Sequence, residues 1–182
     1  MARFGLGYPC FKPDDDEKGV VLGRAVSANM TPNMASGELY ADDTLAEQIS
    51  EFSSASIAME TDSLTDDNAS VVYGCAVNDK EIVYNKDDTP PLGRLGYYQT
   101  LVRRGKKLYK GYRYPRVRAA LGNDNAQTKG NNITFSTEQT NFTVFADDDG
   151  NWRFTETFDT VAEVKAWIDE YCSIGAAQAG DI

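Results

Sequence analysis

The side chains in this sequence that could perform acid–base chemistry are mostly paired aspartates. Such pairs occur at Asp42-Asp43, Asp66-Asp67 and Asp87-Asp88. Two neighbouring carboxylates can divide the roles of general acid and general base when their surroundings separate their pKa values. All three pairs lie in polar stretches, where adjacent carboxylates are usually solvated turns. A small enzyme with a carboxylate site is therefore a weaker hypothesis than the nucleic-acid-binding and assembly hypotheses described below.

A further acidic cluster, Asp147-Asp148-Asp149-Gly150-Asn151, invites a calcium-binding interpretation. An EF-hand loop needs Gly at its sixth position and Glu at its twelfth. The sixth residue counted from Asp147 is Trp152, so the calcium register fails. The Asp-Gly pair is instead typical of a turn. We predict a turn here, and neither a metal nor a cofactor.

Residues for nucleophilic catalysis are scarce. The chain contains no histidine, which removes the commonest general base and the usual catalytic triads. No GxSxG sequence and no phosphate-binding Walker loop occurs. Cys10, Cys75 and Cys172 are far apart, so we expect buried free thiols in a reducing compartment. We expect no enzymatic activity.

The stretch 92–121 is predicted to form a β-hairpin. Runs rich in aromatic and β-branched residues flank Arg104-Gly105-Lys106, which reads as a tight turn. Pro115 cannot donate a ladder hydrogen bond, so we expect a bulge or strand exit there. The hairpin contains no Asp or Glu but nine of the 18 basic residues: Arg94, Arg103, Arg104, Lys106, Lys107, Lys110, Arg113, Arg116 and Arg118. Because the chain has 28 acidic residues and a net charge of −10, a strongly basic hairpin stands in an acidic background.

Tyrosines interleave with these basic residues at Tyr97, Tyr98, Tyr109, Tyr112 and Tyr114. Basic and aromatic side chains together are typical of surfaces that bind single-stranded nucleic acid, so a nucleic-acid-binding module using 92–121 is one hypothesis. Alternatively, long basic side chains protect an edge strand from aggregation. A third interpretation is contact with acidic loops of a neighbouring copy. Since one chain supplies both signs in separate segments, self-complementary assembly explains more of the sequence.

The remaining pattern predicts a mainly β protein of about eight strands and two helices, a β-sandwich or half-barrel with helices packed outside. A turn is expected at Thr31-Pro32-Asn33, a polar connection over 42–50 and a polar loop over 122–130. Besides the hairpin, we expect strands over 20–29, 34–41, 52–59 and 152–154, near 133–135 and 142–145, and a small hairpin at 75–77 and 81–84.

Both helices carry terminal signals. The first is expected over 64–73, with Thr65 as N-cap and Gly74 as the stop. The second follows the capping box Thr160-Val161-Ala162-Glu163. Its apolar residues recur at helical spacing and form one stripe: Val164, Trp167, Ile168 and Tyr171.

Length and charge suit one domain. We expect an extended N-terminal arm over 1–19, a single β-sandwich domain over 20–172 and a flexible tail over 173–182. A net charge of −10 argues against general affinity for DNA or anionic membranes. No apolar run approaches the ~18 residues of a membrane span, and no signal-peptide core follows the N-terminus. These features predict a cytoplasmic chain that does not bind membranes.

The run GRAVSANMTPNMASGELYADDTLAE, residues 23–47, resembles the N-terminal strand pair of major tail proteins from bacteriophages with long, non-contractile tails. Three pieces carry the resemblance: Ser27-Ala28-Asn29, Pro32-Asn33, and Leu39-Tyr40-Ala41-Asp42-Asp43 with Ala46-Glu47. Later pieces occur in the same order: Gly96-Tyr97-Tyr98, Thr128-Lys129-Gly130 before Ile133-Thr134-Phe135, Phe145 to Gly150 with Trp152, and the helix from Phe158-Asp159-Thr160 to Trp167. The basicity and Pro115 of the 92–121 hairpin depart from the family pattern, as does the tail beyond Tyr171.

The resemblance implies a structural virion protein that forms hexameric rings, which stack into the tail tube. Double-stranded genomic DNA would pass through the tube without specific binding. The implied partners are further copies of the chain, the tape measure protein, the distal tail protein and the tail terminator. The implied location is the virion tail, after assembly in the host cytoplasm, with no enzyme activity and no cofactor.

Charge suggests where copies meet. A lumen lined by Arg and Lys would bind DNA through its phosphates and obstruct transit, so we expect an acidic or neutral lumen wall. The basic hairpin turn would then face acidic segments of neighbours, with Asp66-Asp67 as a further possible partner. The candidate interface residues are Asp42, Asp43, Arg103, Arg104, Lys106, Lys107, Asp147, Asp148 and Asp149.

Overall fold

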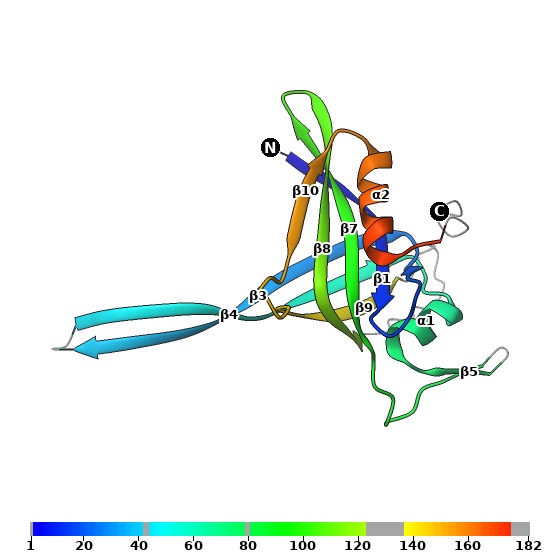
Figure 1. Cartoon of the computed structure of the whole chain (residues 1–182), viewed down its shortest axis with the longest axis horizontal. Helices are drawn as coiled ribbons and strands as arrows, with labels where there is room; N and C mark the ends of the chain where they lie inside the picture. The colour runs from blue at the N-terminus through cyan, green and yellow to red at the C-terminus, as the bar shows by residue number, and fades with distance from the viewer. Residues whose placement is uncertain (1, 42–43, 79–80, 123–136, 176–182) are drawn as a thin grey trace, which may run out of the picture.

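The computed structural model describes residues 2–41, 44–78, 81–122 and 137–175, and these contain ten strands and two helices (Figure 1). The strands are β1 (Ala2–Pro13), β2 (Val20–Val21), β3 (Ala25–Ala41), β4 (Thr44–Thr61), β5 (Ala76–Asn78), β6 (Glu81–Val83), β7 (Leu92–Arg103), β8 (Lys106–Leu121), β9 (Glu138–Phe145) and β10 (Phe154–Phe158). The helices are α1 (Asp66–Tyr73) and α2 (Val161–Cys172). The predicted mainly β class with two helices is confirmed.

Eight strands form one antiparallel sheet in the order β2-β1-β7-β8-β9-β4-β3, and β10 pairs with β8 beside this path. β5 and β6 form a separate small hairpin, as the sequence predicted. The sheet curls strongly. The rings of Phe11 on β1 and Phe142 on β9 lie 5.8 Å apart, although three strand spacings of ~4.8 Å would separate these strands in a flat sheet. The curled sheet is the half-barrel form of the predicted class.

The concave face of the sheet encloses the larger core. Each strand contributes alternate residues to it, as the period of two requires. Ala69 and Val72 of α1 complete this core, and the Tyr73 hydroxyl lies 2.7 Å from Oγ1 of Thr140. Fully buried side chains from the strands include Phe11, Ile57, Met59, Leu95, Tyr114, Val117, Phe142 and Val144.

The second helix covers the convex face of β1, β7 and β8. Its predicted capping box is present, since Thr160 Oγ1 accepts from the Glu163 N–H and Glu163 accepts from the Thr160 N–H. Val164 and Ile168 are buried there, whereas Trp167 is half-buried. The helix approaches closely because β8 carries a glycine, Gly111, where a Cβ would lie 2.7 Å from the Trp167 ring.

The central β7–β8 hairpin forms as predicted. Arg104 and Gly105 have φ values of +50° and +80°, which is the two-residue turn that matches strand twist. The expected irregularity at Pro115 is also present, because Gly93 pairs with Val117 while Leu95 pairs with Tyr114. On the other edge, β8 pairs with β10 as far as Arg113 and with β9 from Arg116. Pro115 therefore lies where neither strand requires its missing N–H.

The expected extended N-terminal arm over 1–19 is wrong for Ala2–Pro13, which form β1. β1 lies inside the sheet between β2 and β7, and Cys10 and Phe11 are fully buried. The Gly and Pro residues that suggested an irregular arm produce register shifts instead. Gly5, with φ of +66°, lies in the first shift, and Pro9 lies in the second.

The expected turn at Thr31-Pro32-Asn33 is also wrong. β3 continues through it, with Pro32 paired to Ala55. β3 lies at the sheet edge, where proline is tolerated because one side of the strand needs no ladder bond. The expected polar connection over 42–50 is wrong for Thr44–Ser50, which belong to β4, while Asp42 and Asp43 lie outside the described residues.

The remaining predictions are confirmed for some segments, shifted for one strand, and outside the described residues for others. α1 has the predicted N-cap, with Thr65 Oγ1 accepting from the Asn68 N–H, and ends at Gly74 with φ of +70°. The strand at 142–145 is confirmed within β9, whereas the strand expected at 152–154 begins at Phe154. The strand near 133–135, most of the 122–130 loop and most of the 173–182 tail lie outside the described residues.

Candidate assembly interface

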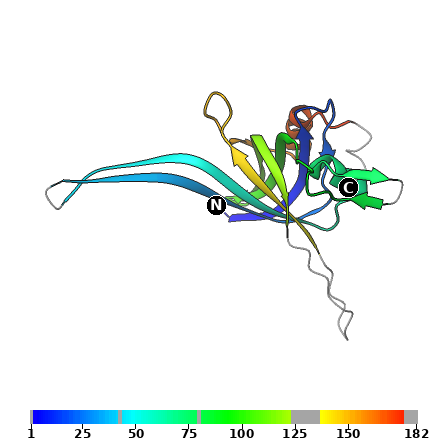
Figure 2. The same ribbon diagram turned by 90° about the horizontal axis from the view of Figure 1, so that it is seen from below.

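The β3–β4 ribbon projects far from the rest of the molecule (Figures 1 and 2). β9 supports β4 from Thr61 as far as Ala55. From there outward to Thr44 the ribbon is two-stranded, a length of about 36 Å at ~3.3 Å per residue. The side chains of residues 31–38 and 48–51 are exposed. An isolated two-stranded ribbon is only marginally stable in water. Beyond Ala55 this ribbon has no third strand to stabilise it.

The outer edge of β3 is unusually open to pairing. β3 is a terminal strand of the sheet and is 17 residues long. Natural edge strands are protected by charges, particularly Lys, by proline, by bulges or by short length. The sequence of β3 is mostly small and polar, with Glu38 as its one charged residue and Pro32 as its one proline, so most of its length lacks these protections. This edge is suited to receive a strand from another chain by main-chain hydrogen bonding.

The four basic residues predicted for the interface lie together at the tip of the β7–β8 hairpin. Arg103, Arg104, Lys106 and Lys107 are all exposed there. Lys106 Nζ lies 2.7 Å from Asp159 Oδ1, just before α2. Both side chains of this pair are about two-thirds exposed, so the ion pair contributes little stability. The tip thus presents positive charge to solvent.

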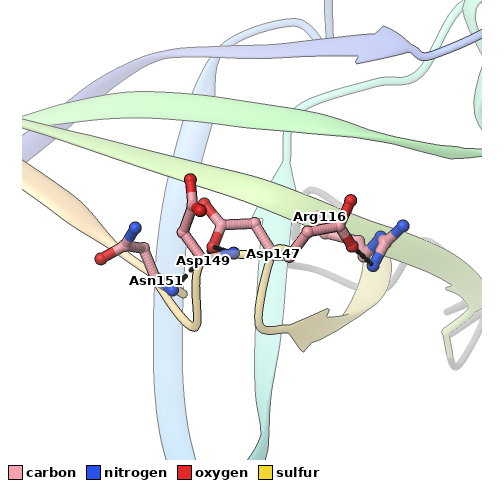
Figure 3. A network of polar contacts seen from close by, with 5 residues as sticks. Arg116, Asp147, Asp149 and Asn151 are labelled. Atoms are coloured by element: carbon pink, nitrogen blue, oxygen red, sulfur yellow. Dashed lines mark hydrogen bonds and ion pairs between the residues drawn. The ribbon is translucent and has the colours of Figure 1, made fainter.

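The acidic cluster at Asp147–Asp149 is a turn, as predicted, and Asp147 organises it (Figure 3). Asp147 Oδ1 accepts from the backbone N–H groups of Asp149 at 3.0 Å and Asn151 at 2.7 Å. Asp148 Oδ1 lies 3.3 Å from Nη1 of Arg116 in the same chain. Asp148 and Asp149 are exposed.

The structure does not bring these predicted groups together within one chain. Lys106 at the tip and Arg116 beside the acidic turn are ten residues apart on β8, about 33 Å along the strand. Asp42 and Asp43 follow the outer end of β3, where Ala41 pairs with Thr44, and lie outside the described residues. Contact between the basic tip and the acidic turn would therefore require two copies.

None of the five hairpin tyrosines is exposed, and three of them lie in the interior. Tyr97, Tyr112 and Tyr114 belong to the concave core, and the hydroxyls of Tyr97 and Tyr114 lie 3.0 Å apart. Burial raises the pKa of Tyr97 well above its usual value. Tyr98 and Tyr109 are half-buried beside α2. The nucleic-acid hypothesis therefore lacks the exposed aromatic rings on which bases would stack, and only the positively charged tip still supports it.

A cavity of about 270 Å³ bears on the carboxylate-enzyme hypothesis. Asp66 and Glu138 line it together with Tyr73 and Tyr84. Glu138 Oε2 accepts a 2.7 Å hydrogen bond from the Leu64 N–H just before α1, which is a structural role. Within the described residues, no group of three His, Cys, Asp or Glu side chains is placed to hold a metal ion.

Sequence reasoning missed the ribbon as a candidate interface. The sequence gives little signal for it, because Pro32, Asn33 and Gly37 within β3 are residue types that favour turns. Of the two helices in the described part of the chain, neither has the length and apolar character needed to cross a membrane. No protein-family model matches the chain, and no curated protein matches it significantly.

Proposed function

We propose that this chain is a structural subunit of a bacteriophage tail, which assembles into stacked hexameric rings that form a tube for genomic DNA. The observation that carries the proposal is the projecting β3–β4 ribbon with its 17-residue edge, on which Glu38 is the one charge and Pro32 the one proline. The segment 23–47, which resembles major tail proteins, includes all of β3 and the outer end of β4. The element with the resemblance is thus the element that needs a partner.

Charge complementarity supports contact between copies. From Thr31 to Ser54 the charged residues are all acidic: Glu38, Asp42, Asp43, Glu47 and Glu51. The β7–β8 tip carries four exposed basic residues. A heterologous contact, in which one patch of each copy meets a different patch of the next, generates rings or filaments. Complementary charges at such contacts set register and association rate more than affinity.

The proposal extends to partners and location. The same subunit would contact the tape measure protein, the distal tail protein and the tail terminator within the virion tail. Double-stranded DNA would pass through the lumen without specific binding. An acidic or neutral lumen wall favours passage because it does not displace the counterions of the phosphates.

The assembly state of purified protein without nucleic acid tests the proposal. We expect rings or tubes by electron microscopy and fast-sedimenting species by analytical ultracentrifugation. A protein that stays monomeric at all concentrations and binds single-stranded oligonucleotides with a steep salt dependence would instead support the nucleic-acid-binding module. The exposed basic tip is the feature on which that alternative rests.

A further inference from the structure

The base of the β3–β4 ribbon combines the end of sheet support with a bulge. β9 pairing ends at Ala55. Immediately outside it, Asn33 pairs with Ser54 and Met34 pairs with Phe52, so Ser53 is an extra residue in β4. A bulge bends a strand and increases its local twist. The position where the ribbon leaves the body is thus also the position where its ladder is interrupted.

One aromatic contact joins the outer ribbon to the body. Among residues 31–38 and 48–53, Phe52 is half-buried while the others are exposed. Its ring stacks on Trp152 with centroids 4.5 Å apart and an interplanar angle of 9°. The guanidinium of Arg153 lies 4.6 Å from the centroid of the same Trp152 ring. Trp152 therefore forms the wall against which the base of the ribbon rests.

Trp152 is held firmly from both sides. Its preceding residue, Asn151, donates its backbone N–H to Asp147 Oδ1 at 2.7 Å and accepts from the Asp147 N–H at 2.8 Å (Figure 3). Two residues after Trp152, Phe154 begins β10 and pairs with Arg113 of β8. The acidic turn at Asp147–Asn151 thus fixes the position of Trp152 beside the ribbon.

We infer that the bulge at Ser53 is a hinge for the ribbon outward of it, and that the Phe52–Trp152 stack is the latch that holds the ribbon at its observed angle. Phe52 and Trp152 are positioning residues in this device, since they set the direction of the ribbon. The inference concerns the isolated chain and holds whether or not the chain forms a tube.

Distance measurements between two spin labels test the latch. Nitroxides would be attached at Ser36→Cys on the ribbon and Thr155→Cys on β10, both exposed, while the three native cysteines are buried. Labelled protein would be diluted with unlabelled protein so that distances within one chain dominate. We expect a narrow distance distribution in the parent protein. Phe52→Ala should add a broad second component, with a roughly 2- to 13-fold larger displaced population, the size of one aromatic-pair interaction.

Matched variants make the outcome decisive. Trp152→Phe keeps a stacked ring and should remain narrow, as should Ile49→Ala, which removes an exposed apolar side chain on the ribbon. A Phe52→Ala distribution as narrow as that of the parent overturns the latch, and so does a parent distribution that is already broad. A latched ribbon on a protein that never assembles would refute the tube proposal and leave this inference standing.

Discussion

The guanidinium of Arg113 lies 3.6 Å from the centroid of the Trp167 ring, and one of its nitrogens donates a hydrogen bond to the Trp167 carbonyl oxygen. Arg113 therefore ties β8 to the C-terminal half of α2, where a cation also complements the helix dipole. Burial lowers the pKa of this guanidinium, although arginine stays charged. This positive charge of the hairpin therefore has a role in the fold.

The half-burial of Trp167 sets the cost of removing it. A fully buried Trp replaced by Ala loses ~3–5 kcal/mol. Because Trp167 is half-buried, we expect Trp167→Ala to lower the free energy of unfolding by about 2 kcal/mol, which includes the lost Arg113 contact. Urea unfolding measures the change. Lys86→Ala, at an exposed position outside this contact, should change stability by less than ~0.5 kcal/mol. A Trp167→Ala protein as stable as the parent contradicts the packing role.

Gly111 provides the space for that tryptophan. A Cβ there would lie 2.7 Å from the Trp167 ring and 3.1 Å from Val164 Cγ2. We expect Gly111→Ala to destabilise the protein by ~1–3 kcal/mol through overpacking. Gly37 on the ribbon has no atom within 4 Å of such a Cβ, so Gly37→Ala is the control and should be neutral or stabilising. Combining Gly111→Ala with Trp167→Ala should cost less than the sum of the two changes. Strict additivity in thermal unfolding would argue against the clash.

Hydrogen exchange should separate β1 from the ribbon. Amides of β1 near Phe11 are inside the sheet and should exchange slowly in the monomer. Amides of the two-stranded part, residues 34–41 and 44–52, should exchange quickly in the monomer and slowly in assembled protein. Mass spectrometry of both forms measures this. Equally slow exchange of the ribbon in both forms would show that it needs no partner.

Reversing the charge of the hairpin tip should slow assembly. We expect Arg103→Glu, Arg104→Glu, Lys106→Glu and Lys107→Glu together to reduce the association rate roughly 10-fold, and added salt to slow the parent protein. Lys18→Glu, at an exposed position outside the hairpin, is the single-charge control. Light scattering follows the rate. A tube structure in which the four basic side chains project into the lumen would refute this role.

Because the thiols of Cys10 and Cys172 are buried, we expect the free energy of unfolding to fall at alkaline pH. Burial raises the pKa of Cys172 to about 12 and raises that of Cys10 as well. In the unfolded chain a thiol ionises near pH ~8.5. Between these values the unfolded state binds fewer protons, so stability falls as pH rises, by about 2 kcal/mol at pH 10 for one such group. Cys172→Ala should make this fall shallower. An unchanged slope of urea-unfolding free energy against pH would contradict the assignment.

The elements that the sequence determined by itself are those whose cause is local. Thr160 and Glu163 satisfy each other's backbone N–H groups within one helical turn. Arg104 and Gly105 form a turn whose positive φ values match the twist of the strands beside it. The bulge at Pro115 follows equally from one missing donor. The acidic turn at Asp147 is closed by its own carboxylate.

The tertiary structure alone decided the position of β1, the length of the ribbon and the fate of the hairpin tyrosines. Gly5 and Pro9 interrupt a ladder that β7 nevertheless continues, and Pro32 sits on an edge where its missing donor matters little. Tyr97 and Tyr114 look alike in sequence whether they face a ligand or a core, and the curl of the sheet places them inside. Strand pairing and burial depend on residues far away in the chain, so local propensity cannot specify them.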